Sequence, residues 1–424
     1  KDFSISYPNM LRVKNKYEIL TGKIYYSFID SYLMLEDYSI INEEINLSGN
    51  TLLDLKNNEI YSFLNIKYLS LKSATKYIPK QVMTRKTSSW FKDSLLRGEI
   101  YDGLIYINGS IDDFPFYDDS KGISYAFGEM KNVKLRYSKD WISLNNFNIF
   151  AEFNNRVCVL ESSTLKILES TFPSIKGVIN DIDNPKIKLI GNFSGPITDI
   201  FKYLKKPNLV NISDSTLNSL SGNSKTDFSL NLSFDDDIKY SAKVKINNAE
   251  YKVSDNFVLN KITGLINLDN ENIGTNQMKP IAGLLNNNKI TINVNSQDND
   301  NIVLDGQLSL DNASYSKIDF LNKYVIGSSM WEYKIILPPF SFLSKKPIKI
   351  YTSSNLVGTS IALPSFLEKK SKDKRNIKLN LTINEGAIKG LRFNYSSILG
   401  ELRFNKTING YINLNGNKKN IPNK

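Results

Sequence analysis

The sequence contains no histidine and only one cysteine, Cys158. Histidine is the commonest general base and a frequent metal ligand, so its absence excludes Ser-His-Asp, Cys-His and HExxH chemistry. A single cysteine excludes an intrachain disulfide, and we interpret Cys158 as a strand residue without special reactivity. We therefore expect no enzyme activity, no metal and no cofactor.

The sequence also lacks a run of about 20 apolar residues, so we expect no transmembrane helix. It shows no signal peptide and begins at Lys1 rather than at a methionine. We expect a segment of a longer protein, with any membrane anchor outside it.

The charge is unbalanced but not concentrated. Lysine and arginine number 54 against 43 aspartates and glutamates, which gives a net charge of +11. Because the lysines are spread along the chain, we favour a biased composition over an anionic partner, and we expect no nucleic-acid binding.

Alternation with a period of two residues is the dominant pattern, and it is typical of strands with one apolar and one polar face. Leu230 and Leu232 alternate with Ser229 and Asn231, for example. Val244, Ile292, Leu304 and Leu308 stand in similar segments, where Lys243, Thr291 and Gln307 are expected to face water. Turn-forming residues separate the segments, which predicts antiparallel sheet joined by hairpins.

Helical patterns are few. One predicted helix runs from about Lys80 to Leu96, and shorter ones are expected near 200–204, 278–285 and 363–370. With 424 residues the chain is too long for one compact core. We divide it into residues 1–212, a polar loop or boundary at 213–225, and residues 226–424.

Two acidic segments resemble calcium loops. Asp112, Asp113, Asp118 and Asp119 flank Phe114-Pro115-Phe116, and Asp298–Asn301 precede a strand. Neither segment has the spacing or the closing glutamate of an EF-hand, so we interpret both as turns.

The apolar strand face has two interpretations. It is either the core of a sandwich, in which two sheets pack face to face, or a groove left open for lipid. Alternation alone does not separate them, and on pattern alone we favour the sandwich.

Three stretches carry a resemblance to a known family. In the first, Tyr77-Ile78-Pro79 leads through Val82-Met83 and Trp90 to Gly98, Gly103, Gly109 and Asp113-Phe114-Pro115-Phe116. The second joins Val133–Leu144, with Tyr137 and Trp141, to Ile187–Gly195 and Pro196. The third joins Ser353–Gly358 to Leu363-Pro364 and Lys369-Lys370. In this order the stretches resemble the central region of the YhdP family of AsmA-like bacterial envelope proteins, which are related to TamB.

The resemblance covers roughly Ile66 to Leu381. It departs from the family at Asn355, where an acidic residue is usual, and residues 209–301 match only in strand pattern.

The resemblance implies an all-β fold: an elongated, twisted, curled antiparallel sheet that forms an apolar groove, with a few short helices. It also implies a periplasmic body of a protein anchored in the inner membrane of a Gram-negative bacterium. Its function would be to move phospholipid to the outer membrane by shielding acyl chains. The alternative is a periplasmic scaffold or assembly factor with closed sandwich cores, whose protein partners are unknown.

The candidate groove residues are the apolar members of the alternating segments. They are Ile105, Ile107, Val133, Leu135, Phe147, Ile149, Phe228, Leu230, Leu232, Phe234, Val244, Ile246, Ile290, Ile292, Val294, Ile302, Leu304, Leu308 and Leu310.

Overall fold

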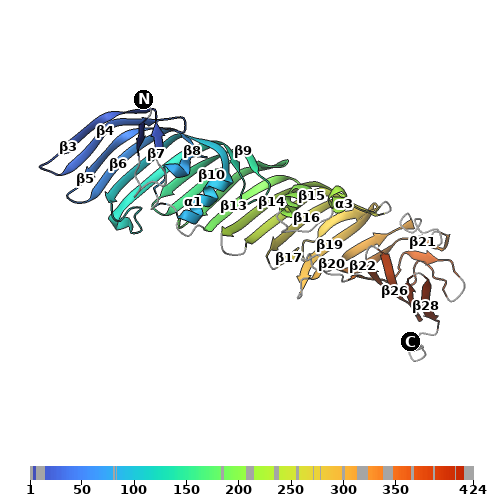
Figure 1. Ribbon diagram of the computed structural model, residues 1–424. Helices are drawn as coiled ribbons and strands as arrows, with labels where there is room; N and C mark the ends of the chain where they lie inside the picture. The colour runs from blue at the N-terminus through green and yellow to red at the C-terminus, as the bar shows by residue number, and fades with distance from the viewer. Residues whose placement is uncertain are drawn as a thin grey trace. The chain divides into compact units, whose positions relative to one another are not determined.

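A computed structural model describes most of the chain (Figure 1). The described residues are 3–5, 15–79, 82, 84–182, 186–206, 214–233, 238–254, 257–270, 272–276, 278–297, 301–312, 323–337, 347–363, 367–384, 387–405 and 407–414. Strands make up 68% of the structure and helices 9%, and 24 strands belong to one large antiparallel sheet. This confirms the predicted all-β class.

Contacts divide the chain into two compact units, described separately below. Unit 1 comprises residues 1–195 and 227–241, and unit 2 comprises residues 196–226 and 242–424. Strands β14 (Leu220–Ser233) and β15 (Lys239–Ser254) have residues in both units.

Unit 1 is a meander, in which each long strand pairs with the next long strand along the chain. Strands β3 to β8 lie side by side at the blue-to-cyan end of Figure 1. The strands are β1 (Phe3–Ile5), β2 (Asn15–Tyr17), β3 (Ile19–Ser27), β4 (Tyr32–Ile41), β5 (Ile45–Asp54), β6 (Glu59–Ser70), β7 (Leu95–Ser110), β8 (Gly122–Leu135), β9 (Leu144–Asn154), β10 (Val157–Ser162), β11 (Leu165–Ile167), β12 (Ser170–Ile179) and β13 (Lys186–Pro196). Helix α1 (Arg85–Ser94) and the short 3-10 helices η1 (Ala74–Lys76) and η2 (Asp119–Lys121) complete it.

Unit 2 continues the same pattern, with two helices near its start. Helices α2 (Ile197–Lys205) and α3 (Asp214–Asn218) precede β14. The strands are β16 (Phe257–Asp269), β17 (Ile273–Gly274), β18 (Ile281–Leu285), β19 (Asn288–Gln297), β20 (Asn301–Leu310), β21 (Val325–Gly327), β22 (Ser329–Leu337), β23 (Ile348–Ser354), β24 (Thr359–Ile361), β25 (Ile377–Asn384), β26 (Ala387–Tyr395), β27 (Ile398–Phe404) and β28 (Ile408–Asn413). Strands β21 and β24 pair separately as a small second sheet.

Bulges keep the apolar residues of long strands on one face. Asp102 and Asn132 adopt positive φ angles of 51° and 53°, and the pairing of β7 with β8 and of β8 with β9 shifts at these points. A bulge inserts one extra residue and thereby restores the side-chain alternation that an odd spacing would reverse. Ile100 and Ile105 therefore share a face although five positions separate them.

Two of the four predicted helices are confirmed. Helix α1 lies within residues 80–96; the Thr84 hydroxyl accepts a hydrogen bond from the Thr87 amide at 3.2 Å, which caps its N-terminus. The Trp90 indole donates to the carbonyl of Tyr137 at 2.9 Å and holds the helix to the chain after β8. Helix α2 contains residues 200–204.

The other two predicted helices are wrong. Residues 281–285 form strand β18, because β16 and β19 pair with it on both sides. In the segment 363–370, residues 364–366 lie outside the described part of the chain; none of the described residues is helical, and Lys369 makes a β-bridge with Ile361. The expected loop at 213–225 is also wrong, since α3 and the first half of β14 occupy it. Whether it marks a domain boundary remains a prediction.

Of the two acidic segments that we interpret as turns, the structure describes only the first. Residues 298–300 lie outside the described part of the chain. In the other turn, the Phe116 side chain is completely buried, and its ring lies so close to Gly109 and Gly122 that a Cβ on either glycine would overlap it. The motif Phe114-Pro115-Phe116 thus folds the β7–β8 connection onto its own strands.

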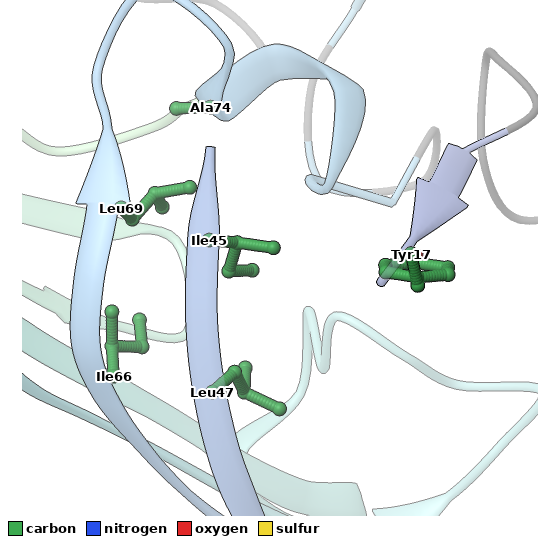
Figure 2. Packing of buried hydrophobic residues seen from close by; sticks show 6 residues of the cluster. All are labelled: Tyr17, Ile45, Leu47, Ile66, Leu69 and Ala74. Atoms are coloured by element: carbon green, nitrogen blue, oxygen red, sulfur yellow. The ribbon is translucent and has the colours of Figure 1, made fainter. Parts of the chain in front are cut away.

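Figure 2 shows the packing that covers one end of unit 1. Ile45 and Leu47 of β5 and Ile66 and Leu69 of β6 point from the sheet toward Tyr17 of β2, and Ala74 of η1 closes the cluster. The β1–β2 hairpin and η1 therefore cover the apolar face of these strands.

Candidate functional site

In unit 1, an unbroken row of apolar side chains crosses seven paired strands, from β6 to β13. Directly paired residues of antiparallel strands lie on the same face of the sheet. The row consists of Leu64, Ile105, Ala126, Phe153, Cys158, Ile179 and Ile187.

Unit 2 contains a second row of the same kind, from β19 to β27. It consists of Val294, Leu304, Ile335, Ile350, Leu381, Leu391 and Leu402. At about 4.8 Å between strands, seven strands cover about 29 Å, close to the hydrocarbon thickness of a whole bilayer. We refer to the sheet face that carries each row as the apolar face of that unit.

The apolar faces are only partly covered. Six of the seven residues in each row remain partly exposed, and only Cys158 and Val294 are buried. A closed core would bury such residues almost completely. This partial exposure favours an open face over a sandwich interior.

The described core clusters also favour an open face over a sandwich interior. Two of them pack residues of neighbouring strands under a local cover, which is the β1–β2 hairpin with η1 in unit 1 and helix α2, through Ile197 and Phe201, in unit 2. The third gathers Ile281, Val294 and Ile302 with side chains from adjacent strands alone. In unit 1 this cover is the separate two-stranded sheet of β1 and β2, whereas in the third cluster no second sheet packs against the first.

The apolar face is most exposed at the outermost strands. In unit 1, Ile24 of β3 pairs with Leu35 and is 72% exposed. In unit 2, Ile408 of β28 pairs with Phe404 and is 69% exposed. The apolar face is therefore exposed to solvent at these strands, unlike the parts covered by the β1–β2 hairpin and by helix α2.

The predicted groove residues fall on these faces wherever pairing is described. Ile105 and Ile107, Val133 and Leu135, and Phe147 and Ile149 share the face of the first row. Ile290, Ile292, Ile302, Leu304 and Leu308 share the face of the second row. Leu310 alternates with Leu308 on β20 and lies on the same face. Whether these residues contact lipid remains a prediction.

Predicted residues on β14 and β15 behave consistently with that placement. The rings of Phe228, Phe172 and Phe193 contact one another, with centroids 5.0 to 6.1 Å apart. Leu230 is partly buried and Leu232 buried, and Val244 and Ile246 pack under α2. Phe234 lies outside the described residues.

The opposite face differs between the units. In unit 2, Gln307 and Lys243 are exposed as expected and Thr291 is partly exposed. In unit 1, by contrast, aromatic residues occupy the opposite face of β6 to β9, where Phe63 pairs with Tyr106. This face therefore departs from the alternation, which predicts one apolar and one polar face. The sequence signal for these aromatic residues is the presence of large apolar side chains at alternate positions, namely Tyr61, Phe63, Leu104 and Tyr106.

Cys158 and Lys369 are two of the ionisable side chains that are buried in the described part of the chain. Cys158 is 2% exposed, and burial raises the pKa of its thiol to about 12, which agrees with an unreactive cysteine. Lys369 donates to the carbonyls of Thr359 at 2.7 Å and Lys370 at 2.9 Å, and burial lowers its pKa. These bonds fix the segment between β24 and β25. Lys369 belongs to the third stretch that resembles the family, but the sequence alone did not predict this structural role.

Within the described residues, no three cysteine, aspartate or glutamate side chains are grouped so as to hold a metal ion. Among the described helices, none is long and apolar enough to cross a membrane.

The profile of the family described as YhdP protein matches residues 1–423 of the chain. The chain belongs to the YhdP family. This family consists of bacterial envelope proteins. No curated protein and no solved structure is significantly similar to the chain.

Membership in the YhdP family extends the resemblance beyond the residues that first suggested it. The similar stretches covered about residues 66 to 381, whereas the match includes all strands from β1 to β28. The apolar faces of both units therefore lie within the family region.

Proposed function

We propose that the chain moves phospholipid between the inner and outer membranes, as the periplasmic section of a conduit that shields acyl chains. The supporting observation is the pair of apolar rows, each crossing seven strands and each left partly exposed. Family membership and the all-β fold are consistent with this role.

The energetics explain why an extended face suits this task. Transfer of two acyl chains of about 16 carbons from a bilayer into water costs about 25 kcal/mol of free energy, at about 0.8 kcal/mol per methylene group. Side chains such as Leu304 and Ile335 replace that water without directional bonds. A lipid on such a face can slide from strand to strand, because no single position binds it much more strongly than the next.

The proposal requires no catalysis. The chain would act through its surface, without a cofactor, as the periplasmic body of a protein anchored in the inner membrane. Acyl chains are the proposed ligand, and the headgroups would remain in water.

Photocrosslinking tests the proposal on one strand. Residues 304 and 307 of β20 lie on opposite faces, since Leu304 pairs with Val294 and Gln307 pairs with Thr291. A photoreactive amino acid at position 304 should crosslink phospholipid from vesicles, and one at position 307 should not. Equal crosslinking from both positions would refute the proposal, and crosslinks from position 304 only to protein would favour the scaffold alternative.

A further inference from the structure

Unit 2 has a polar pocket on the face opposite its apolar row. Its volume is about 620 Å³, within the range of about 300–1,000 Å³ typical of small-molecule sites. Its side chains come from strands β19, β20, β22, β23 and β25. By strand pairing, ten of the thirteen lining residues lie on the face opposite the apolar row, whereas Gly306, Tyr333 and Thr352 share the face of the row.

Two neighbouring cross-strand rows form the pocket. Asn293, Asp305, Lys334, Tyr351 and Asn380 pair in one row. Thr291, Gln307, Glu332, Ser353 and Lys378 pair in the other. Apart from the tyrosine ring, these side chains end in hydroxyl, amide, carboxylate or ammonium groups. Acyl chains are therefore excluded from the pocket, because they would leave these groups without hydrogen bonds.

The floor of the pocket is fixed. Gly306 lacks a side chain, and the Tyr333 hydroxyl lies close to it and donates to the carbonyl of Thr291 at 2.7 Å. A Cβ at Gly306 would overlap that carbonyl oxygen. The polar side chains of the pocket thus rise from a rigid section of sheet.

The charges of the pocket balance. Asp305 and Glu332 carry two negative charges, and Lys334 and Lys378 carry two positive ones. Within the described residues, Glu332, Lys334 and Lys378 form no ion pair with each other or with Asp305. The balance disfavours a phosphate or a simple cation as ligand, and it favours a neutral molecule with many donors and acceptors.

The side-chain oxygen of Asn293 also favours a ligand that donates hydrogen bonds. The Asn293 amide donates to Asp305 Oδ2 at 3.2 Å, whereas its Oδ1 atom is buried and has no partner among the described groups. A buried acceptor without a partner is costly, so a rotation of the Asn293 amide that presents this oxygen to a donor of a ligand in the pocket would be favoured. Tyr351 adds an exposed ring, whose negative face attracts polarised C–H groups.

We infer that this pocket binds a saccharide, on the face of the sheet that carries no lipid. Sugar hydroxyls both donate and accept, which suits the mixed amide, carboxylate and ammonium groups. The C–H face of a sugar ring suits Tyr351. Such a site would attach the chain to a polysaccharide independently of any lipid on the apolar face.

Calorimetric titration of the chain with cellobiose and di-N-acetylchitobiose tests this inference, with inorganic phosphate and choline as ionic probes. At least one disaccharide should bind, and Tyr351→Ala and Asn293→Ala should each weaken its binding by about tenfold. Lys349→Ala is the matched control, because Lys349 lies on the same face of β23 outside the pocket.

Several results would overturn the saccharide site. They are no binding of either disaccharide at millimolar concentration, binding of phosphate or choline instead, or disaccharide binding that survives both pocket variants. Crosslinking of lipid from position 304 should be unchanged in Tyr351→Ala. Failure of the saccharide site is thereby distinguishable from failure of the proposed lipid transport.

Discussion

A carboxylate on the apolar face should block lipid in a pH-dependent manner. Leu304 lies between Val294 and Ile335 in the middle of the unit 2 row and is partly exposed. In Leu304→Asp, the short side chain cannot extend to the sheet edge. Each acyl chain that passes must therefore cover the carboxylate or wait until it is protonated.

Protonation sets an upper limit to the cost. An aspartate with a pKa of about 3.9 requires about 4 kcal/mol to hold a proton at pH 7, at 1.36 kcal/mol per pH unit. The same limit is about 1.5 kcal/mol at pH 5. Lipid occupancy at this position should thus fall by up to about 1,000-fold at pH 7 and by only about tenfold at pH 5.

Lipid transfer between donor and acceptor vesicles, measured at both pH values, provides the assay. Gln307→Asp on the opposite face of β20 is the control and should transfer lipid normally. Circular dichroism should show that Leu304→Asp remains folded, because the carboxylate stays hydrated while the face is empty. The reasoning is refuted if the variant unfolds, if Gln307→Asp is equally inactive, or if the block does not weaken at pH 5.

Three further predictions concern the fold. Cys158 should resist maleimide at pH 8 until the chain is unfolded, and rapid labelling of the native chain would contradict its burial. Burial raises the pKa of the Cys158 thiol to about 12, so the thiol ionises first in the unfolded chain, and its contribution to stability should decline above pH 9. Phe116→Ala should lower the free energy of unfolding by about 3–5 kcal/mol in denaturant titrations, because the ring is completely buried, and a loss below 1 kcal/mol would argue against its packing role. Thr84→Ala should lower the free energy of unfolding by about 1 kcal/mol through loss of the α1 cap, whereas Thr84→Ser keeps a capping hydroxyl and should retain most of the stability. Equal effects of the two substitutions would exclude the cap as the cause.

Alternation identified the strands because it reports directly on which side chains share a face. It placed Ile290, Ile292 and Leu304 correctly relative to one another, since each lies on a regular stretch of strand. It did not locate bulges such as those at Asp102 and Asn132. A bulge depends on how two strands pair, and one strand alone does not encode its partner.

Short apolar segments were ambiguous for a related reason. Ile281, Leu284 and Leu285 are spaced three and four apart, as on a helix face, yet they form strand β18 between two partners. Tertiary pairing outweighs such a weak local preference. The polar pocket was equally inaccessible, because its residues come from five strands and converge only when all five registers are known.

The order of pairing within each unit has a consequence for how the molecule forms. Long strands pair with partners that are close in sequence, such as β5 with β6 and β26 with β27. Short loops close at a small entropic cost, so hairpins of this kind assemble quickly and in succession. A growing chain can therefore add each hairpin to an edge that is already folded. For the same reason, duplication or loss of a hairpin would change the length of the sheet without disturbing its existing pairs, which gives evolution a simple means of adjusting the span of such proteins.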